Sequence, residues 1–230
     1  MNIDYQGNNE AQDVLRWALD KFHPDIALAC SFQYTVLIHM MLEIRPEVKI
    51  FAIDTGRLPE ETYQCAADVE RRFGVNITWY TPRHEALQEL LNEHGPFSFK
   101  KSVEARRSCC AVRKVEPMNR ALKGLRAWIT GVRRDQSATR QHARKIQVDD
   151  AHGGIIKVCP LADWTDHDVR EYVKKYNLPY NPLIDQGYPS IGCACCTRPV
   201  QPGEDPRAGR WWWEESEHKE CGLHIPNWQI

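Results

Sequence analysis

The sequence lacks a charge excess and a long apolar run. Its 230 residues carry 30 basic and 31 acidic side chains, a formal charge of −1, so it has no overall electrostatic footprint for nucleic acid or an anionic membrane. No apolar run approaches the ~18 residues that a membrane span requires, and nothing at the N-terminus resembles a basic and apolar signal sequence. We therefore expect a soluble, cytoplasmic protein that binds any anionic ligand through local side chains.

Cysteine, by contrast, is abundant. The chain has nine cysteines, and without a secretion signal a disulfide framework is less favoured than metal binding or thiol chemistry. At 42% hydrophobic residues, a chain of this length can bury one good core, and we expect one domain with an appendage.

Hydrophobic periodicity predicts alternating helices and strands. Helices are expected at residues 11–22, 36–44, 60–73, 85–93, 106–122 and about 166–175, and strands at 25–29, 48–53, 76–80, 127–130 and 155–158. This alternation predicts a parallel α/β sheet of at least four strands with flanking helices. Thr165 or Asp166 is the expected cap of the last helix. Residues 179–210 contain six prolines and several glycines, which indicates a loop-rich and mobile region.

Two groups of clustered cysteines indicate a four-thiolate site. Cys109 and Cys110 are adjacent on a predicted helix, and Cys193 and Cys196 have CxxC spacing. Four thiolates suit zinc or an iron–sulfur cluster. Adjacent helical residues point ~100° apart, so the pair addresses two irons of a cubane more easily than one small ion. This favours a [4Fe–4S] cluster over zinc and over ordinary buried cysteines. Cys195 is expected to be a spectator, although it could replace Cys196 or Cys193 in a slightly different loop.

Polar residues follow three predicted strands. In an open α/β sheet these carboxyl ends line the ligand crevice. Ser31 precedes a helix, where backbone N–H groups can bind a phosphate, although such a serine is often only a helix cap. The other two strand ends carry Asp54, Thr55 and Gly56, and then Arg133 and Arg134.

Further cations lie near the cysteines and in the tail. The basic residues around the cysteine pair would offset the charge of a thiolate-bound cluster and attract an anionic substrate; they are Arg106, Arg107, Arg113 and Lys114. Arg207 and Arg210 could clamp an oxyanion. The run 211–213 of three tryptophans is costly to expose and should dock onto the body or a partner.

Three motifs together resemble the assimilatory adenylylsulfate reductases of the phosphoadenylylsulfate/adenylylsulfate reductase family, over nearly the whole chain. They are Cys109-Cys110-Ala111-Val112-Arg113-Lys114, Tyr188-Pro189-Ser190-Ile191-Gly192-Cys193 with Cys196, and Glu220-Cys221-Gly222-Leu223-His224. The resemblance implies an adenine-nucleotide α-hydrolase-like (Rossmann-like) core in residues 1–197. It also implies a mobile tail in residues 198–230, which carries the catalytic nucleophile Cys221.

The resemblance further implies roles for individual residues. The [4Fe–4S] cluster would be held by Cys109, Cys110, Cys193 and Cys196. Ser31 would belong to the phosphate loop, with Asp54, Thr55 and Gly56 lining the nucleotide pocket. The phosphosulfate would meet Lys114, Arg133 or Arg134, Arg207, Arg210 and His224. This sequence departs from the common pattern in two places: cysteine stands at position 195, where proline is usual, and residues 32–35 form a short phosphate loop.

The implied reaction is a reductive cleavage. The Cys221 thiolate attacks the sulfur of the sulfate group, AMP leaves, and an S-sulfocysteine remains. Since the chain contains no thioredoxin-like domain, a partner, by resemblance thioredoxin, must supply the reducing dithiol. Reduction of 3′-phosphoadenylylsulfate is the nearest alternative, and a zinc-stabilised nucleotide-binding module is a more distant one. A sulfur-inserting ATPase of RNA is disfavoured by the net charge and the lack of a Ser-Gly-Gly loop. A homo-oligomer is compatible with the sequence.

Overall fold

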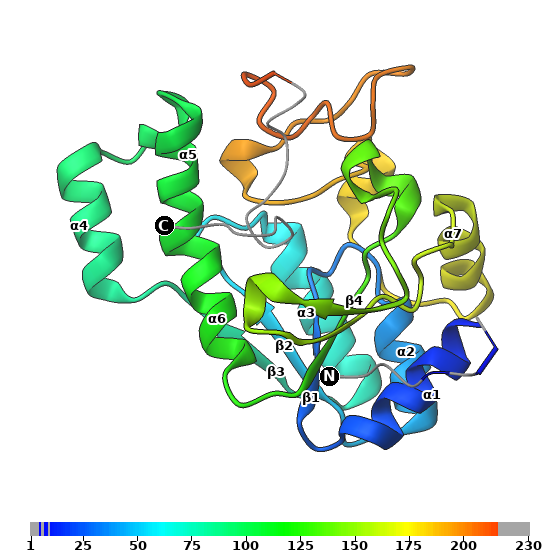
Figure 1. Cartoon of the computed structure of the whole chain (residues 1–230). Helices are drawn as coiled ribbons and strands as arrows, with labels where there is room; N and C mark the ends of the chain where they lie inside the picture. The colour runs from blue at the N-terminus through cyan, green and yellow to red at the C-terminus, as the bar shows by residue number, and fades with distance from the viewer. Residues whose placement is uncertain (1–4, 6, 9, 216–230) are drawn as a thin grey trace.

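The fold is built on one six-stranded sheet with helices on both faces (Figure 1). It is seen in a computed structural model that describes residues 5, 7, 8 and 10–215. The strands are β1 (Ile26–Ala29), β2 (Lys49–Ile53), β3 (Ile77–Tyr80), β4 (Ala127–Thr130), β5 (Ile146–Asp149) and β6 (Ile155–Val158). They lie in the order β3-β2-β1-β4-β6-β5. All neighbouring pairs are parallel except β5 with β6.

Side chains alternate between the two faces of each strand, and this separates the core into two layers. One layer packs against α1 (Ala11–Phe22), α2 (Val36–Ile44), α3 (Glu60–Phe73) and α7 (Asp166–Lys175). It takes Leu28, Ile50 and Ile129 from the strands. The other layer takes the intervening Ala27, Phe51 and Trp128 and packs against α6 (Glu116–Leu122). The predicted α/β fold class is thus confirmed, with an antiparallel edge strand added.

The helix that the sequence predicts at residues 106–122 is interrupted. It begins as α5 (Val103–Cys110), widens into a π-helical segment at Ala111–Val115, and continues as α6. Pro117 explains the widening, because proline has no N–H to donate and its ring clashes with the carbonyl group four residues earlier. The preceding helix α4 (His84–His94) lies beside this segment (Figure 1). The π turn follows directly after Cys109 and Cys110.

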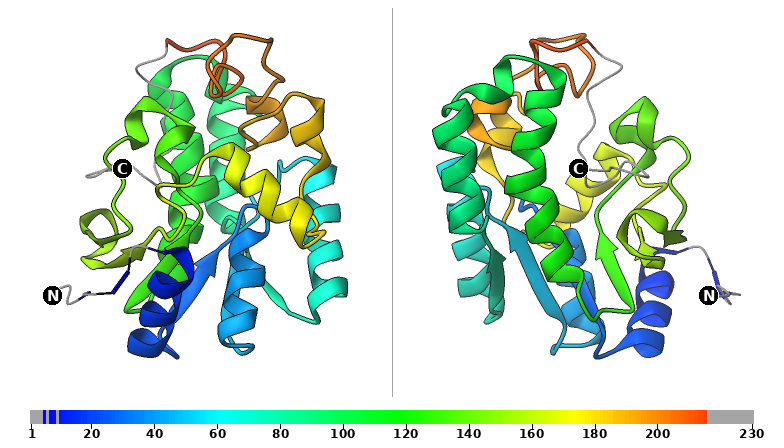
Figure 2. Two further views of the ribbon diagram at one scale, coloured as in Figure 1. Left: turned by 90° about the vertical axis from the view of Figure 1, so that its right-hand side faces the viewer. Right: turned by 60° about the vertical axis from the view of Figure 1, so that its left-hand side comes forward.

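The residues after α7 have little regular structure, as expected, but they pack closely. Short 3-10 turns occur at Pro182–Gln186 and Ala194–Cys196. An antiparallel bridge joins Thr197 to Arg210, and Trp211 is only 1% exposed. Figure 2 shows this orange-to-red segment beside the end of α5. Across the described part of the chain, none of the helices combines the length and the apolar character that a membrane crossing needs.

Candidate active site

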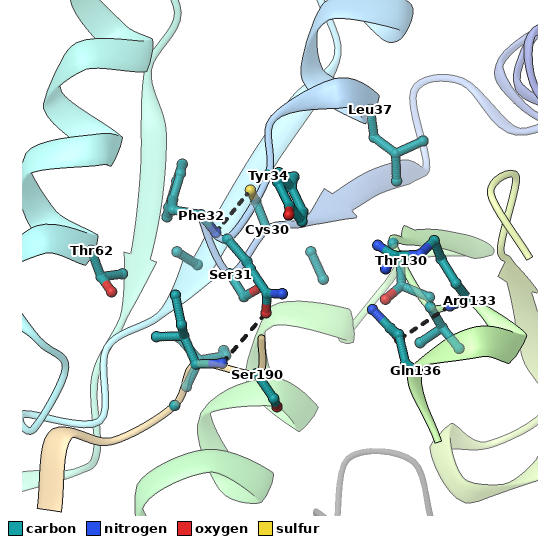
Figure 3. Close-up of a pocket in the computed structure, with 18 of the residues that line it drawn as sticks. Cys30, Ser31, Phe32, Tyr34, Leu37, Thr62, Thr130, Arg133, Gln136 and Ser190 are labelled. Atoms are coloured by element: carbon teal, nitrogen blue, oxygen red, sulfur yellow. Dashed lines mark hydrogen bonds between the residues drawn. The ribbon is translucent and has the colours of Figure 1, made fainter. Parts of the chain in front are cut away.

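A cavity of about 410 Å³ lies where β1, β2 and β4 end (Figure 3). The strand register explains its position, because Ala29 of β1 pairs with Phe51 of β2 on one side and with Thr130 of β4 on the other. The loops that follow these strands therefore leave the sheet side by side. Apolar side chains from the strands line its floor, and polar side chains from the loops line its walls.

The loop after β1 contributes Ser31 to the cavity wall and is fixed by its neighbours. Phe32 has a left-handed φ of 53°, and its backbone N–H points at the Cys30 sulfur, 3.4 Å away (Figure 3). The Gln33 side-chain amide donates to the Pro189 carbonyl at 2.8 Å and accepts from the Ile191 N–H at 3.4 Å. The phosphate-loop region is thereby tied to the segment that precedes the CxxC cysteines.

The loop after β2 is organised by Asp54. Its carboxylate accepts hydrogen bonds from the Gly56 N–H at 2.7 Å and from the Tyr63 hydroxyl at 2.8 Å. Gly56 has a φ of +67°, a conformation that favours glycine. Thr55 lines the cavity, whereas Asp54 and Gly56 support it from the loop. The Thr55 carbonyl accepts from Arg113 Nη1 at 2.6 Å, which links this loop to the π segment.

The two consecutive arginines after β4 have different surroundings. Arg133 lines the cavity and is 5% exposed. It donates from Nε to Asp135 at 3.0 Å and from Nη2 to Asp166 at 3.3 Å. Arg134 is exposed and instead donates from Nε to the Ala143 carbonyl at 2.9 Å. Of the two arginines that the sequence offered, Arg133 is therefore the one that faces the cavity.

The opposite end of the cavity is cationic and is contributed by Lys114, Arg207 and Arg210. Both arginines approach the Ser190 hydroxyl, at 3.4 Å from Arg207 Nη1 and 3.3 Å from Arg210 Nη1. Within the described chain, Arg210 Nε is buried without a hydrogen-bond partner. A Cβ at Gly192 would lie 2.3 Å from Arg210 Nη2, so any other residue at this position would displace the guanidinium group from its present place. The arrangement can bind an oxyanion that accepts several hydrogen bonds.

A second, smaller cavity is lined by the clustered cysteines. Cys109 and Cys110 approach from α5, and Cys193, Cys195 and Cys196 approach from the CxxC turn. The first two and the CxxC pair are buried, with exposures of 6–8%. The four cysteines that the sequence singles out therefore border one space, with Cys195 beside them. In the part of the chain that the structure describes, no three His, Cys, Asp or Glu side chains converge closely enough to hold a single metal ion.

The electrostatics around the CxxC turn favour thiolate at Cys193 and Cys195 but not at Cys196. The Cys196 thiol donates a hydrogen bond to Cys193, and with Lys114 and Arg210 nearby it holds the pKa of Cys193 well below its usual range despite burial. The same hydrogen bonding lowers the pKa of Cys195 to about 6, with help from Arg57, and raises that of Cys196. Thiolate is the form that binds metals.

The two cavities share a wall. Lys114 lines both, and the Thr55 hydroxyl lies 3.2 Å from the Cys193 sulfur. A group held by the cysteines would therefore lie directly behind the cationic end of the larger cavity.

The tryptophan run docks onto the body, as expected. The Trp211 ring is stacked among cations, with the guanidinium carbons of Arg106 and Arg210 at 4.6 and 4.7 Å from its centroid. Its backbone N–H donates to the Cys196 carbonyl at 3.1 Å. Arg106 is in turn held by a buried, bidentate ion pair with Glu214. Trp211 therefore positions Arg210 next to the cysteine turn.

Two predicted catalytic residues, Cys221 and His224, lie outside the described residues. Ser190, Gly192, Gln33 and Asp166 were not singled out as site residues from the sequence. Ser190 and Gly192 carried a signal, because they precede the CxxC pair within one of the three motifs, and Gln33 carried one as part of the expected phosphate loop at residues 32–35. Asp166 was expected only as a possible helix cap, and the fold brings it to the cavity.

A mainly parallel sheet with a cavity at its strand ends is typical of adenine-nucleotide-binding α/β proteins. Solved structures share this α/β fold. An FMN adenylyltransferase from Candida glabrata superimposes with a TM-score of 0.59 at 16% identity, covering 92% of this chain and 72% of that one, a likeness of fold alone. The phosphoadenylyl-sulfate (PAPS) reductase from Candida auris gives a TM-score of 0.70 at 32% identity, covering 82% and 90%.

Sequence comparisons are more specific. The phosphoadenosine phosphosulfate reductase domain matches residues 25–199. The adenosine 5′-phosphosulfate reductase of Burkholderia cepacia is 46% identical over 218 residues, covering 94% of this chain and 87% of that protein. The enzyme of the same name from Allochromatium vinosum is 49% identical over 189 residues, covering 82% and 73%. The chain therefore belongs to the phosphoadenosine phosphosulfate reductase family, among its adenosine 5′-phosphosulfate reductases, which confirms the resemblance of the motifs.

Proposed function

We propose that this chain reduces adenosine 5′-phosphosulfate to sulfite and AMP, using Cys221 as nucleophile and thioredoxin as reductant. The observation that carries the proposal is the shared wall of the two cavities. A nucleotide-sized cavity ends in Lys114, Arg207 and Arg210, and the same lysine borders the cluster of cysteines. The relatives that bear the name of this activity are 46–49% identical.

Different residues of the cavity bind different parts of the substrate. The apolar floor receives the adenine ring, and the arginines held at Ser190 bind the phosphosulfate oxygens. Hydrogen bonds and positive charge at this end stabilise the charge that develops on the leaving phosphate oxygen. The thiolate of Cys221 attacks the sulfur, and the bond between sulfur and the phosphate oxygen breaks with its electron pair on AMP. His224 lies three residues further on and is proposed to assist the thiolate.

The second half of the reaction needs an external dithiol. One of its thiolates attacks Cys221 Sγ, the S–S bond to the sulfonate breaks, and sulfite leaves with the bonding electrons. The second thiol of the donor then displaces Cys221 from the mixed disulfide, so the donor is oxidised by two electrons and the enzyme is restored. None of the eight described cysteines is in a disulfide, which is compatible with the reducing, cytoplasmic location that we propose for this cycle.

The donor set fits a [4Fe–4S] cluster held by Cys109, Cys110, Cys193 and Cys196. Buried sulfurs arrive from two separate segments around one space, and cations that favour thiolates adjoin it. Such a cluster would supply a fixed charge and a brace between α5 and the CxxC turn. Lys114, shared by both cavities, is placed to bind substrate on one side and to balance thiolate charge on the other.

We propose the division between a core of residues 1–197 and a tail of residues 198–230 as a functional one. The family domain match ends at residue 199. Residues 198–214 nevertheless pack on the body through Trp211 and the Arg106–Glu214 pair. If residues 198–230 moved together during the reaction, the ion pair between Arg106 and Glu214 would have to break.

Sulfite release from the two sulfonucleotides, with thioredoxin present, tests the reaction. We expect release from adenosine 5′-phosphosulfate, little release from the 3′-phosphorylated nucleotide, and no release by the C221S variant. Cys159→Ala is the matched control, because Cys159 is buried and lines neither cavity; it should stay active. Preference for the 3′-phosphorylated substrate, or an active C221S enzyme, would contradict the proposal.

Metal analysis of anaerobically purified protein tests the cluster. We expect absorbance at about 400 nm and about four irons per chain. A colourless, zinc-loaded protein would instead support the zinc-stabilised binding module.

A further inference from the structure

The end of the large cavity that lies away from the cysteines carries a closed network of charges. Arg133 is held between Asp135 and Asp166 (3.0 and 3.3 Å). The second oxygen of Asp166 accepts from Arg170 Nε at 2.6 Å, and the Tyr34 hydroxyl donates to Asp166 at 3.2 Å. Both carboxylates and Arg133 line the cavity. Arg133 and Arg170 are therefore paired with the two aspartates, and Arg140 adds a third cation at this end of the cavity.

Neighbouring contacts hold this network in place. Asp135 also accepts the backbone N–H of Asp166, the first residue of α7, at 2.7 Å. The backbone N–H of Arg133 donates to Gln136 at 3.1 Å (Figure 3). Arg140, which lines the same end, donates to the same Gln136 oxygen at 2.6 Å. The buried Arg133 guanidinium is consequently oriented toward carboxylates of the protein itself.

The two ends of the cavity thus offer different chemistry. The end beside the cysteines has Arg210, whose buried Nε has no hydrogen-bond partner among the described residues, and this end suits an oxyanion. The end beside α7 presents carboxylate oxygens whose charge is balanced, and such oxygens accept hydrogen bonds from neutral hydroxyls. A carboxylate that binds a ribose hydroxyl, in place of an arginine that binds a ribose phosphate, is a general means of discrimination between such nucleotides.

A sulfonucleotide has three matching parts. The phosphosulfate fits the cationic end, adenine fits the apolar floor, and the ribose diol fits the remaining polar wall at Asp135 and Asp166. A phosphate on the 3′-oxygen would then bring about two negative charges toward these two carboxylates. Arg133 is already paired with Asp135 and Asp166, so the 3′-phosphate could bind Arg133 only by displacing one of these carboxylates.

We propose that the Asp135–Arg133–Asp166 network is the element that selects nucleotides with a free 3′-hydroxyl and rejects those with a 3′-phosphate. This inference rests on the proposed function, because it assumes that the cavity binds the adenine nucleotide.

Equilibrium binding of AMP and of adenosine 3′,5′-bisphosphate to the full-length protein tests the inference without any turnover. The wild-type chain should bind the bisphosphate no more tightly than AMP. In Asp166→Asn, the ratio of bisphosphate affinity to AMP affinity should rise by about tenfold, because one unit charge near the added phosphate has been removed. Glu171→Gln is the matched control: it removes one charge from an exposed position on the same helix, and its ratio should stay at the wild-type value.

Each outcome is decisive. A wild-type protein that binds the bisphosphate tenfold more tightly than AMP would overturn the inference with no variant needed. An unchanged ratio in D166N with AMP binding intact would overturn it as well, while the proposed function would stand. If the wild-type protein binds neither nucleotide, the proposed function itself is wrong. If D166N fails to fold, Asp135→Asn provides the same comparison from the other carboxylate.

Discussion

The ion pair between Arg106 and Glu214 holds the start of the tail against the cysteine site, and Glu214→Gln should release it. Both side chains are nearly inaccessible, at 1% and 3% exposure, and the pair is bidentate, with distances of 3.0 and 2.8 Å. A glutamine can accept only one of the two hydrogen bonds, and its amide group then faces a guanidinium donor. The variant therefore removes the carboxylate that forms the ion pair with buried Arg106.

The expected cost is large. Removal of one partner from a buried ion pair typically costs ~3–5 kcal/mol, against a total stability of about 5–15 kcal/mol. If the whole loss fell on global unfolding, the melting temperature of a chain of this size would drop by roughly 6–12 °C at the lower bound. Since the pair joins α5 to residues 198–214, part of the loss should appear instead as local opening of that segment.

Hydrogen exchange and thermal unfolding, measured side by side, separate these two effects. We expect faster exchange in peptides from residues 198–214 of E214Q, with little change in β1, β2 and β4. Glu215→Gln is the control, since it removes the same charge from the next residue, which is exposed. If E214Q and E215Q were indistinguishable in both measurements, the pair would not anchor the tail and this reasoning would be refuted.

Three further predictions follow from other contacts. Cys195→Ala should keep its iron while Cys196→Ala loses it, as iron analysis would show; equal loss in both would make Cys195 a ligand. Thr165→Ala removes the hydroxyl that accepts a hydrogen bond from the Asp168 N–H in the first turn of α7. The free energy of unfolding, measured in denaturant titrations, should fall by ~1 kcal/mol; an unchanged value would contradict the capping role. Although burial alone would raise it, the pKa of Asp149 is held below its usual 3.8 by the hydrogen bond from His152. Its contribution to stability is therefore present above pH 3.8 and lost as the pH falls through the lower folded-state value. In Asp149→Asn, the melting temperature should therefore fall less steeply with decreasing pH in this range than it does in the wild-type protein. An unchanged dependence on pH would contradict the pairing of Asp149 with His152.

The sequence predicted the helices and buried strands well because their residues have one clear period. The predicted ranges 11–22, 36–44 and 60–73 coincide with α1, α2 and α3, where apolar residues recur at helical spacing over a buried face. Of the two residues expected as the cap, Thr165 or Asp166, the cap is Thr165, whose hydroxyl forms a capping box with the Asp168 side chain.

The errors also have physical reasons. Strand β5 was missed because it lies at the edge of the sheet and is only partly buried, with Val148 at 36% exposure, so its residues lack a strong apolar pattern. The π segment was missed because helical periodicity does not reveal where Pro117 forces the helix to widen. The sequence alone also could not show which of Arg133 and Arg134 faces the cavity. Their side chains point in different directions because Arg133 pairs with Asp166 of α7 and Arg134 donates to the Ala143 carbonyl, and these contacts form only in the folded chain.

Mass spectrometry can show whether Cys221 carries the sulfonate during the reaction. The full-length protein is incubated with adenosine 5′-phosphosulfate in the absence of any reductant, digested and mapped cysteine by cysteine. We predict a sulfonate adduct on Cys221 that disappears, with release of sulfite, when reduced thioredoxin is added. An adduct on any other cysteine, or sulfite formation with Cys221 unmodified throughout, would contradict it.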